Sequence, residues 1–167
     1  DDRTSRGLGD VYKRQIDLVS DNTKVIFIAN PNNPTGTKVP KEEIYKLLDS
    51  IPSNILVVVD EAYCEYLIKN QRMDVSKDLT KWKNLVIVKT FSKIYGLAGL
   101  RIGFAMGDNE IIDKIQKPRE PFNVNSLAQS AAVAAMDDEE HLEKSFQMNI
   151  SGTVSYTHLT LPTTDRG

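Results

Sequence analysis

This sequence has a single cysteine, no long apolar run and little net charge. Each of these features excludes some classes of protein. The 167 residues include a single cysteine, Cys64, so no disulfide forms within the chain, which predicts a reducing, cytoplasmic location. No apolar run approaches the roughly 20 residues of a membrane span, and we find no secretory signal at the start of the chain. A net charge of -2 gives no reason to expect a nucleic-acid partner.

The remaining composition is that of a soluble globular domain. Apolar residues make up 40% of the chain and charged residues 26%, which are ordinary proportions. A chain of 167 residues is long enough to bury a real hydrophobic core. We assign no metal-binding residues.

The two ends of the chain look foreign to the middle. Residues 1–15 and 153–167 have no usable helix or strand period. Residues 10–15 can be encoded by GAT GTG TAT AAG AGA CAG, and the reverse complement of that string encodes residues 154–158 in another frame. An inverted sequencing adapter would produce this relationship, so we expect both ends to be adapter-derived and residues 16–152 to be genuine protein. The alternative is a pair of natural disordered termini.

The middle of the chain alternates apolar strands with amphipathic helices. Such alternation predicts an α/β fold with a mostly parallel sheet, whose ligands bind beyond the carboxyl ends of the strands. We expect buried strands at 24–30 and 55–59, further strands at 85–88 and 102–106, and helices starting at Pro40 and covering 109–116, 126–136 and 139–147.

Three polar segments follow these strands, and none is decisive alone. In residues 90–101 the hydroxyls of Thr90 and Ser92 and the guanidinium of Arg101 suit a phosphate, and Lys93 could act as a nucleophilic amine, although a solvated lysine is the simpler reading. Asp60 ends a buried strand, a costly place that calls for a positive partner such as magnesium or a protonated heterocycle. Residues 30–36, NPNNPTG, form a turn by composition.

In combination, the segments NPNNPTG, VVVDEAY and TFSKIYGLAGLRIG resemble the fold type I pyridoxal phosphate (PLP) enzymes, in that family's order and spacing. The resemblance covers residues 16–150. It implies a three-layer α/β/α large domain, here incomplete. It also implies a cis bond before Pro34, and a homodimer for the full-length protein.

The resemblance assigns a role to each matching position. It implies that Lys93 forms the covalent link with PLP and moves the proton during catalysis, and that Asp60 pairs with the pyridinium nitrogen. The remaining cofactor-binding residues would contact the phenolic oxygen or the phosphate; they are Asn33, Tyr63, Thr90, Ser92 and Arg101.

Residues 117–129, KPREPFNVNSLAQ, look like those of the histidinol-phosphate aminotransferases. That likeness implies transfer of an amino group between glutamate and imidazole acetol phosphate in histidine biosynthesis. Two alternatives stay open, a threonine-phosphate decarboxylase-like lyase and the aminotransferase-like effector domain of a transcription regulator. We expect the chain as written to have little activity, because the family's upstream phosphate loop and substrate-binding arginine cannot be assigned in it. We also expect His141 to be a solvated helix residue.

Overall fold

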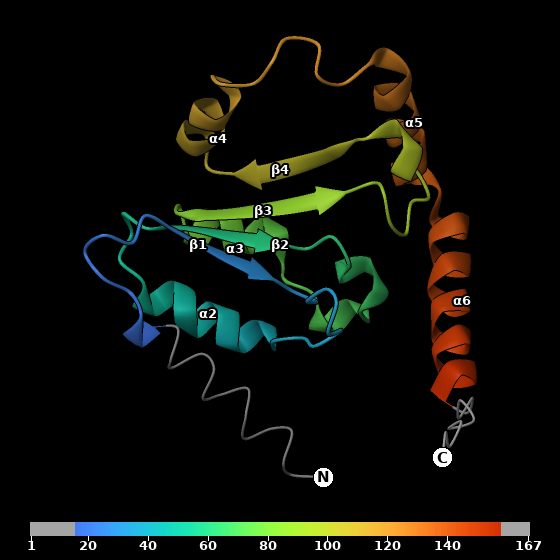
Figure 1. Ribbon diagram of the computed structural model, residues 1–167, viewed down its shortest axis with the longest axis horizontal. Helices are drawn as coiled ribbons and strands as arrows, with labels where there is room; N and C mark the ends of the chain where they lie inside the picture. Colours follow the sequence, from blue (N-terminus) through green and yellow to red (C-terminus); the bar gives the residue numbers. More distant parts are fainter. Residues whose placement is uncertain (1–15, 158–167) are drawn as a thin grey trace, which may run out of the picture.

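The computed structural model describes residues 16–157, with side chains to residue 152, so the predicted adapter-derived ends lie almost wholly outside the described residues. Strands and helices alternate along the chain, as expected (Figure 1). The strands are β1 (Val25–Ala29), β2 (Leu56–Asp60), β3 (Leu85–Thr90) and β4 (Gly103–Gly107). The helices are α2 (Lys41–Ser50), α3 (Val75–Lys81), α4 (Asn109–Gln116), α5 (Ser126–Asp137) and α6 (Glu139–Thr157).

The four strands form one sheet in the order β1-β2-β3-β4. The first three strands run parallel, with Val25 opposite Leu56 and Val57 opposite Leu85. Strand β4 is antiparallel to β3, with Thr90 opposite Gly103. The mostly parallel α/β sheet predicted from the strand and helix alternation is therefore confirmed.

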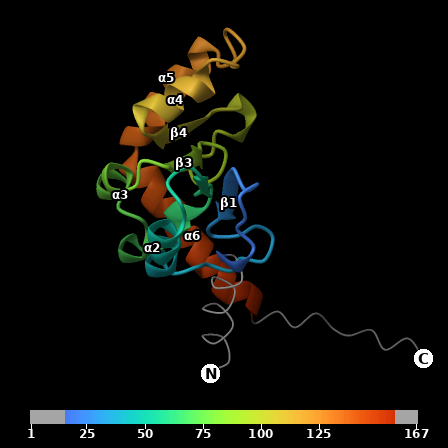
Figure 2. The same cartoon turned by 90° about the vertical axis from the view of Figure 1, so that its left-hand side faces the viewer.

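Helices α2 and α3 cover one face of the sheet (Figure 2). Helix α2 begins directly after Pro40, and its apolar residues recur every three or four positions, so that Ile44, Leu47 and Leu48 share one buried face. They pack in one cluster with Val57 and other residues of β2 and β3. Strand β2 is apolar up to its last residue, Asp60, and its residues Val57, Val58 and Val59 are buried on both faces of the sheet.

Strand β1 corrects the prediction of a fully buried strand at 24–30. Only one of its faces is covered: Ile28 belongs to the core, whereas Val25 and Phe27 are 41% and 76% exposed. The strand lies at the edge of the sheet, and the side chains on its second face stay largely exposed. The apolar run therefore predicted the strand correctly, but the predicted burial of both its faces was wrong.

Helices α5 and α6 carry the chain past the carboxyl end of β3 (Figure 1). Ala128 and Ala132 of α5 pack on Phe91 and Ile102 in a second, smaller cluster. Helix α6 is longer than the 139–147 segment expected, and its backbone runs to Thr157, into the first residues of the predicted adapter-derived end. None of the helices described between residues 16 and 157 is long and apolar enough to cross a membrane.

Candidate functional site

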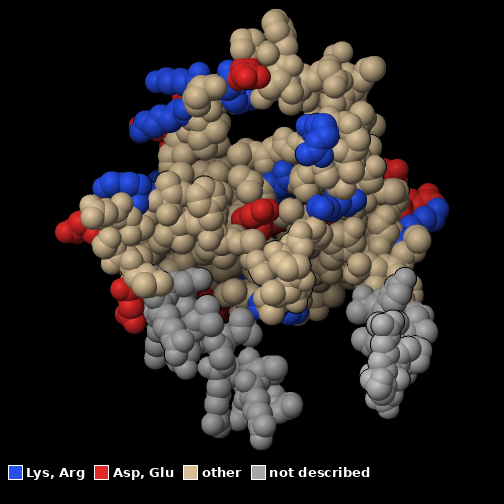
Figure 3. All heavy atoms as spheres, in the orientation of Figure 1, with Lys and Arg blue, Asp and Glu red and all other residues tan. Residues whose placement is uncertain are grey.

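The sheet topology brings the polar segments to one edge. Asn33 follows β1, Asp60 ends β2 and Thr90 ends β3, and parallel strands place their carboxyl ends together. Strand β4 runs antiparallel to β3 and begins at that same edge, so Arg101, just before the start of β4, lies there too. Phe91 N donates to Ile102 O at 3.1 Å, which joins the segments that follow β3 and precede β4. Figure 3 shows acidic and basic side chains beside one another near the centre of one face of the molecule.

Asn33, Tyr63 and Lys93 form the best-defined part of the site. Asn33 Nδ2 donates to the Tyr63 hydroxyl at 3.3 Å, although 30 positions separate the two residues in the chain. The Lys93 ammonium lies 5.0 Å from the centroid of the Tyr63 ring, within the range of a cation–π contact. The peptide bond before Pro34 is cis, as the resemblance implied, and so is the bond before Pro31.

Asp60 lies at the expected end of β2, but the reasoning that placed it there needs a correction. Its side chain is exposed, so no positive partner is needed to offset burial. Among the described residues it accepts one hydrogen bond, at 2.9 Å from Ala62 N to Oδ1. The carboxylate that is buried at this edge is the neighbouring Glu61, which is 3% exposed and pairs with Lys89.

The three residues expected to hold a phosphate are only partly assembled. Thr90 Oγ1 accepts a hydrogen bond from Ser92 N at 3.1 Å, so these two residues form one turn. Arg101 has a left-handed backbone, with φ 54°, and its Nη1 donates to Ala98 O at 2.9 Å. The structure thus joins Thr90 and Ser92 and turns the Arg101 guanidinium toward its own loop.

Two residues that sequence reasoning missed border the site. Tyr66 and Asn149 line a cavity of about 520 Å³ together with Asn33 and Tyr63. Burial raises the pKa of Tyr66, against the opposing effect of the nearby Lys93 charge. Tyr66 could have been suspected from its closeness to Tyr63 in sequence, whereas Asn149 comes from α6 and carries no signal in the sequence.

His141 is an exposed residue of α6, as expected, but its ring also contacts the turn that carries Lys93. Its Nε2 lies 3.0 Å from Ile94 O, one residue after Lys93. A Cβ added at Gly96 would lie 3.6 Å from the same atom of His141. Gly96 has φ 71°, a conformation that favours glycine. The turn that carries Lys93 is therefore held against α6.

Comparison with known proteins agrees with this fold. The model of the class I and II aminotransferases matches residues 9–153 of the chain. The chain belongs to this family of aminotransferases.

Several relatives within the family share one name. The chain is 53% identical over 131 residues to the histidinol-phosphate aminotransferase of Caldicellulosiruptor saccharolyticus, a match that covers 78% of this chain and 37% of that protein. Other relatives, 42–51% identical, carry the same name. The chain thus spans well under half the length of the curated relatives it matches.

Two solved structures bear on the chemistry. Histidinol-phosphate aminotransferase from Sinorhizobium meliloti, solved in complex with pyridoxal-5'-phosphate, is 31% identical with a TM-score of 0.71 and covers 85% of this chain and 37% of that one. L-threonine-O-3-phosphate decarboxylase from Porphyromonas gingivalis is 25% identical with a TM-score of 0.69. This match covers 89% of this chain and 46% of the decarboxylase.

Proposed function

We propose that the chain is the cofactor-binding part of a PLP-dependent aminotransferase. The convergence of Asn33, Tyr63 and Lys93 at the carboxyl edge of the sheet carries this proposal. These residues come from segments that follow three different strands, and a turn or a solvated lysine alone would not bring them together. Family membership supports the same conclusion.

The residues present fit PLP by their chemistry. The Asp60 carboxylate is exposed and can accept a hydrogen bond from a protonated ring nitrogen, worth about 1.5–3 kcal/mol. Asn33 and the Tyr63 hydroxyl can donate to a phenolic oxygen, and Thr90, Ser92 and Arg101 supply hydroxyls and a cation for a phosphate.

Lys93 is the amine that would bind the cofactor and carry a proton. Its side chain is exposed beside Tyr63, so a ligand at the edge of the sheet can reach it. Bound PLP supplies the electron sink that an aminotransferase needs, and the chain orients it. When not bonded to the cofactor, the Lys93 amine would be free to take or return a proton.

The substrates proposed are glutamate as amino donor and imidazole acetol phosphate as keto acceptor. The relatives named histidinol-phosphate aminotransferase, at 42–53% identity, support this choice. We further propose a cytoplasmic homodimer for the complete protein, which contains more chain than these 167 residues. Residues 16–152 are part of the large domain of that protein, whereas residues 1–15 and 153–167 of the present sequence are adapter-derived and do not belong to it.

Threonine-phosphate decarboxylase-like activity is the second candidate, because the Porphyromonas gingivalis enzyme shares this fold at 25% identity. Product analysis separates the two activities. An aminotransferase converts 2-oxoglutarate to glutamate in the presence of histidinol phosphate, whereas the lyase releases CO2. An effector domain of a transcription regulator would do neither.

The first test addresses Lys93. PLP is added to the protein, the adduct is reduced with borohydride, and the modified lysine is mapped by mass spectrometry. We expect modification at Lys93, lost in Lys93→Ala and kept in Lys77→Ala, an exposed lysine of α3 that pairs with Asp74. The absorbance band that PLP gives when bound to the lysine is recorded as well. If Lys93→Ala leaves both the adduct and this band unchanged, the assignment is refuted.

The boundaries have their own test, which is to sequence the source DNA beyond the codons for Ile16 and Gly152. A reading frame that continues in both directions, without the codons of residues 1–15 and 153–167, supports adapter-derived ends. A locus that encodes both ends would contradict them.

A further inference from the structure

A buried ionic cluster lies directly behind the residues proposed to contact PLP. The Lys89 ammonium is 2.8 Å from Glu65 Oε1 and 3.2 Å from Glu61 Oε2. It also lies 2.8 Å from the Cys64 sulfur. The Lys89 side chain is 16% exposed, and the Glu61 and Glu65 side chains are 5% and 11% exposed, so water screens these charges little.

The cluster connects β3 to the turn that follows β2. Lys89 belongs to β3, one residue before Thr90, and the two glutamates flank the segment that contains Tyr63. The only regular secondary structure described within this turn is the 3-10 helix Cys64–Tyr66. Its backbone contact with β3 is at Glu61, whose N donates to Val88 O at 2.9 Å. Beyond Glu61, the side chain of Lys89 connects the turn to β3 through Cys64 and Glu65.

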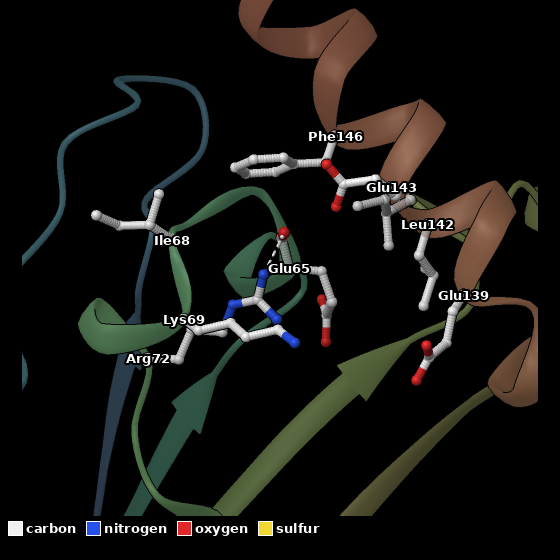
Figure 4. A pocket seen from close by; sticks show the side chains of 9 residues that line it. Glu65, Ile68, Lys69, Arg72, Glu139, Leu142, Glu143 and Phe146 are labelled. Atoms are coloured by element: carbon white, nitrogen blue, oxygen red, sulfur yellow. Dashed lines mark hydrogen bonds between the residues drawn. The ribbon is translucent and has the colours of Figure 1, made fainter.

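Arg72 fixes the same turn from its other side. Its Nη2 donates to Glu65 O at 2.8 Å and its Nε donates to Leu67 O at 2.9 Å. Figure 4 shows this guanidinium against the Glu65 backbone, at the border of a cavity of about 460 Å³ between the turn and α6. Arg72 thus holds the backbone of the turn, whereas Lys89 holds its acidic side chains.

The protonation states of the cluster agree with a permanent ion pair. Burial by itself lowers the pKa of Lys89, but its hydrogen bonds to Cys64 and Glu65 and the charge of Glu65 oppose burial, and the pKa of Lys89 is raised overall. Burial, followed by the charges of Glu61 and Glu65, raises the pKa of the Cys64 thiol. At neutral pH the cluster therefore holds a charged lysine and a neutral thiol. Losing the lysine would leave buried carboxylates unpaired, which is strongly unfavourable.

We propose that Lys89 is a positioning residue that, through Glu61 and Glu65, holds Tyr63 and Tyr66 in place beside Lys93. The proposal rests on the function proposed above, because the positioned tyrosines matter only if PLP binds there. Lys89 itself contacts neither Lys93 nor Asn33. Its effect on the cofactor is indirect and passes through Tyr63.

The test compares Lys89→Met, which keeps the length and removes the charge, with Lys89→Arg, which restores the charge. Lys144→Met is the control, because Lys144 forms an exposed pair with Glu140 on α6. Amide hydrogen exchange of residues 61–67, measured without cofactor, reports the turn. We expect faster exchange in Lys89→Met, near-parent exchange in Lys89→Arg, and no change in Lys144→Met.

The second readout has two parts, the affinity for PLP and the pH midpoint, the pH at which the absorbance band of bound PLP is half converted. Both are measured under conditions in which each variant is folded. We expect Lys89→Met to weaken affinity by about tenfold or more, since small misplacements at such sites have large effects. Removing the Tyr63 hydroxyl withdraws a donor from the phenolic oxygen and should itself shift the midpoint. If Lys89 acts through Tyr63, the shift caused by Lys89→Met disappears in the Tyr63→Phe background.

Unchanged exchange in Lys89→Met would overturn the proposal, and so would altered exchange with parent-like PLP affinity and midpoint. If the parent itself forms no adduct at Lys93, the proposed function fails, while hydrogen exchange still decides whether Lys89 holds the turn. Should Lys89→Met not fold, Glu65→Gln replaces it, because it keeps the shape and removes one charge. Parent-like exchange and affinity in Glu65→Gln would then overturn the proposal.

Discussion

Cys64 illustrates how the surroundings of one residue set its chemistry. The sulfur is 1% exposed, and burial together with the charges of Glu61 and Glu65 raises the pKa of its thiol. Because the thiolate is the reactive form, the folded protein should hold very little of it at pH 8. The sequence offers no other cysteine that would confuse a measurement.

We expect Cys64 to react with Ellman's reagent at pH 8 far more slowly in the folded protein than in urea. The physical reason is twofold, since the sulfur is enclosed and its proton is held tightly. The rate of absorbance increase with and without urea measures the difference. Equal rates in both conditions would contradict the burial of Cys64.

Single residues also mark the limits of sequence reasoning. The identities of Asn33, Tyr63 and Lys93 were predicted from three segments, and the structure brings them to one edge. The exposure of Asp60 and the burial of Glu61 could not be predicted, because both depend on which side of the strand end faces the neighbouring turn. His141 likewise contacts Ile94 O only because α6 packs beside the Lys93 turn.

At the scale of elements, α2 and α3 are joined by polar side chains at the edge of an apolar core. The Tyr45 hydroxyl donates to Asp78 Oδ2 at 2.9 Å, and the Tyr45 ring stacks on Trp82 with centroids 5.0 Å apart. Trp82 Nε1 in turn donates to Asp49 of α2 at 2.8 Å. Burial and the Asp78 contact raise the pKa of Tyr45 to about 12.

This raised pKa predicts a loss of stability in alkali. The unfolded chain loses the Tyr45 proton near pH 10, but the folded chain keeps it to about pH 12. The stabilisation is therefore complete below pH 10 and declines as the pH rises from 10 to 12. We expect the free energy of unfolding, measured in urea, to fall more steeply over this range in the parent than in Tyr45→Phe. Identical slopes would contradict the pairing.

Periodic elements were predictable, but the short helix α3 and the exposure of the edge strand β1 were not. Helix α2 has a clear apolar face, and the segments 109–116 and 126–136 proved helical. Helix α3 was missed because its seven residues give too few turns for a period to show. The exposure of Phe27 was missed because an apolar run does not reveal whether a strand lies at the edge of a sheet.

At the scale of the whole molecule, the chain spans only a part of each relative's length, and this limits the activity that we expect. The chain spans 37% of the Caldicellulosiruptor saccharolyticus protein, and catalysis in this family should need residues beyond it. We expect the 167-residue chain to form little or no glutamate from 2-oxoglutarate and histidinol phosphate. Clear turnover by the purified chain would contradict this.

A chimera provides the matching positive experiment. Residues 16–152 replace the corresponding segment of the Caldicellulosiruptor saccharolyticus protein, to which this chain is 53% identical over 131 residues. We expect the chimera to retain transaminase activity and to lose it with Lys93→Ala but not with Lys77→Ala. A folded but inactive parent chimera would argue that the segment belongs to another activity, and CO2 release would favour the lyase.

The sequence by itself determined the fold class, the family and the residues at the edge of the sheet. The fold class follows from the alternation of apolar runs with amphipathic helices, and the family and the site residues follow from the resemblance of three polar segments to known PLP enzymes. Only the tertiary structure decided which carboxylate is buried, that Lys89 pairs with Glu61 and Glu65, and that Tyr66 and Asn149 line the same cavity. Such contacts join residues far apart in the chain, and their geometry depends on how the strands pair and where the helices pack.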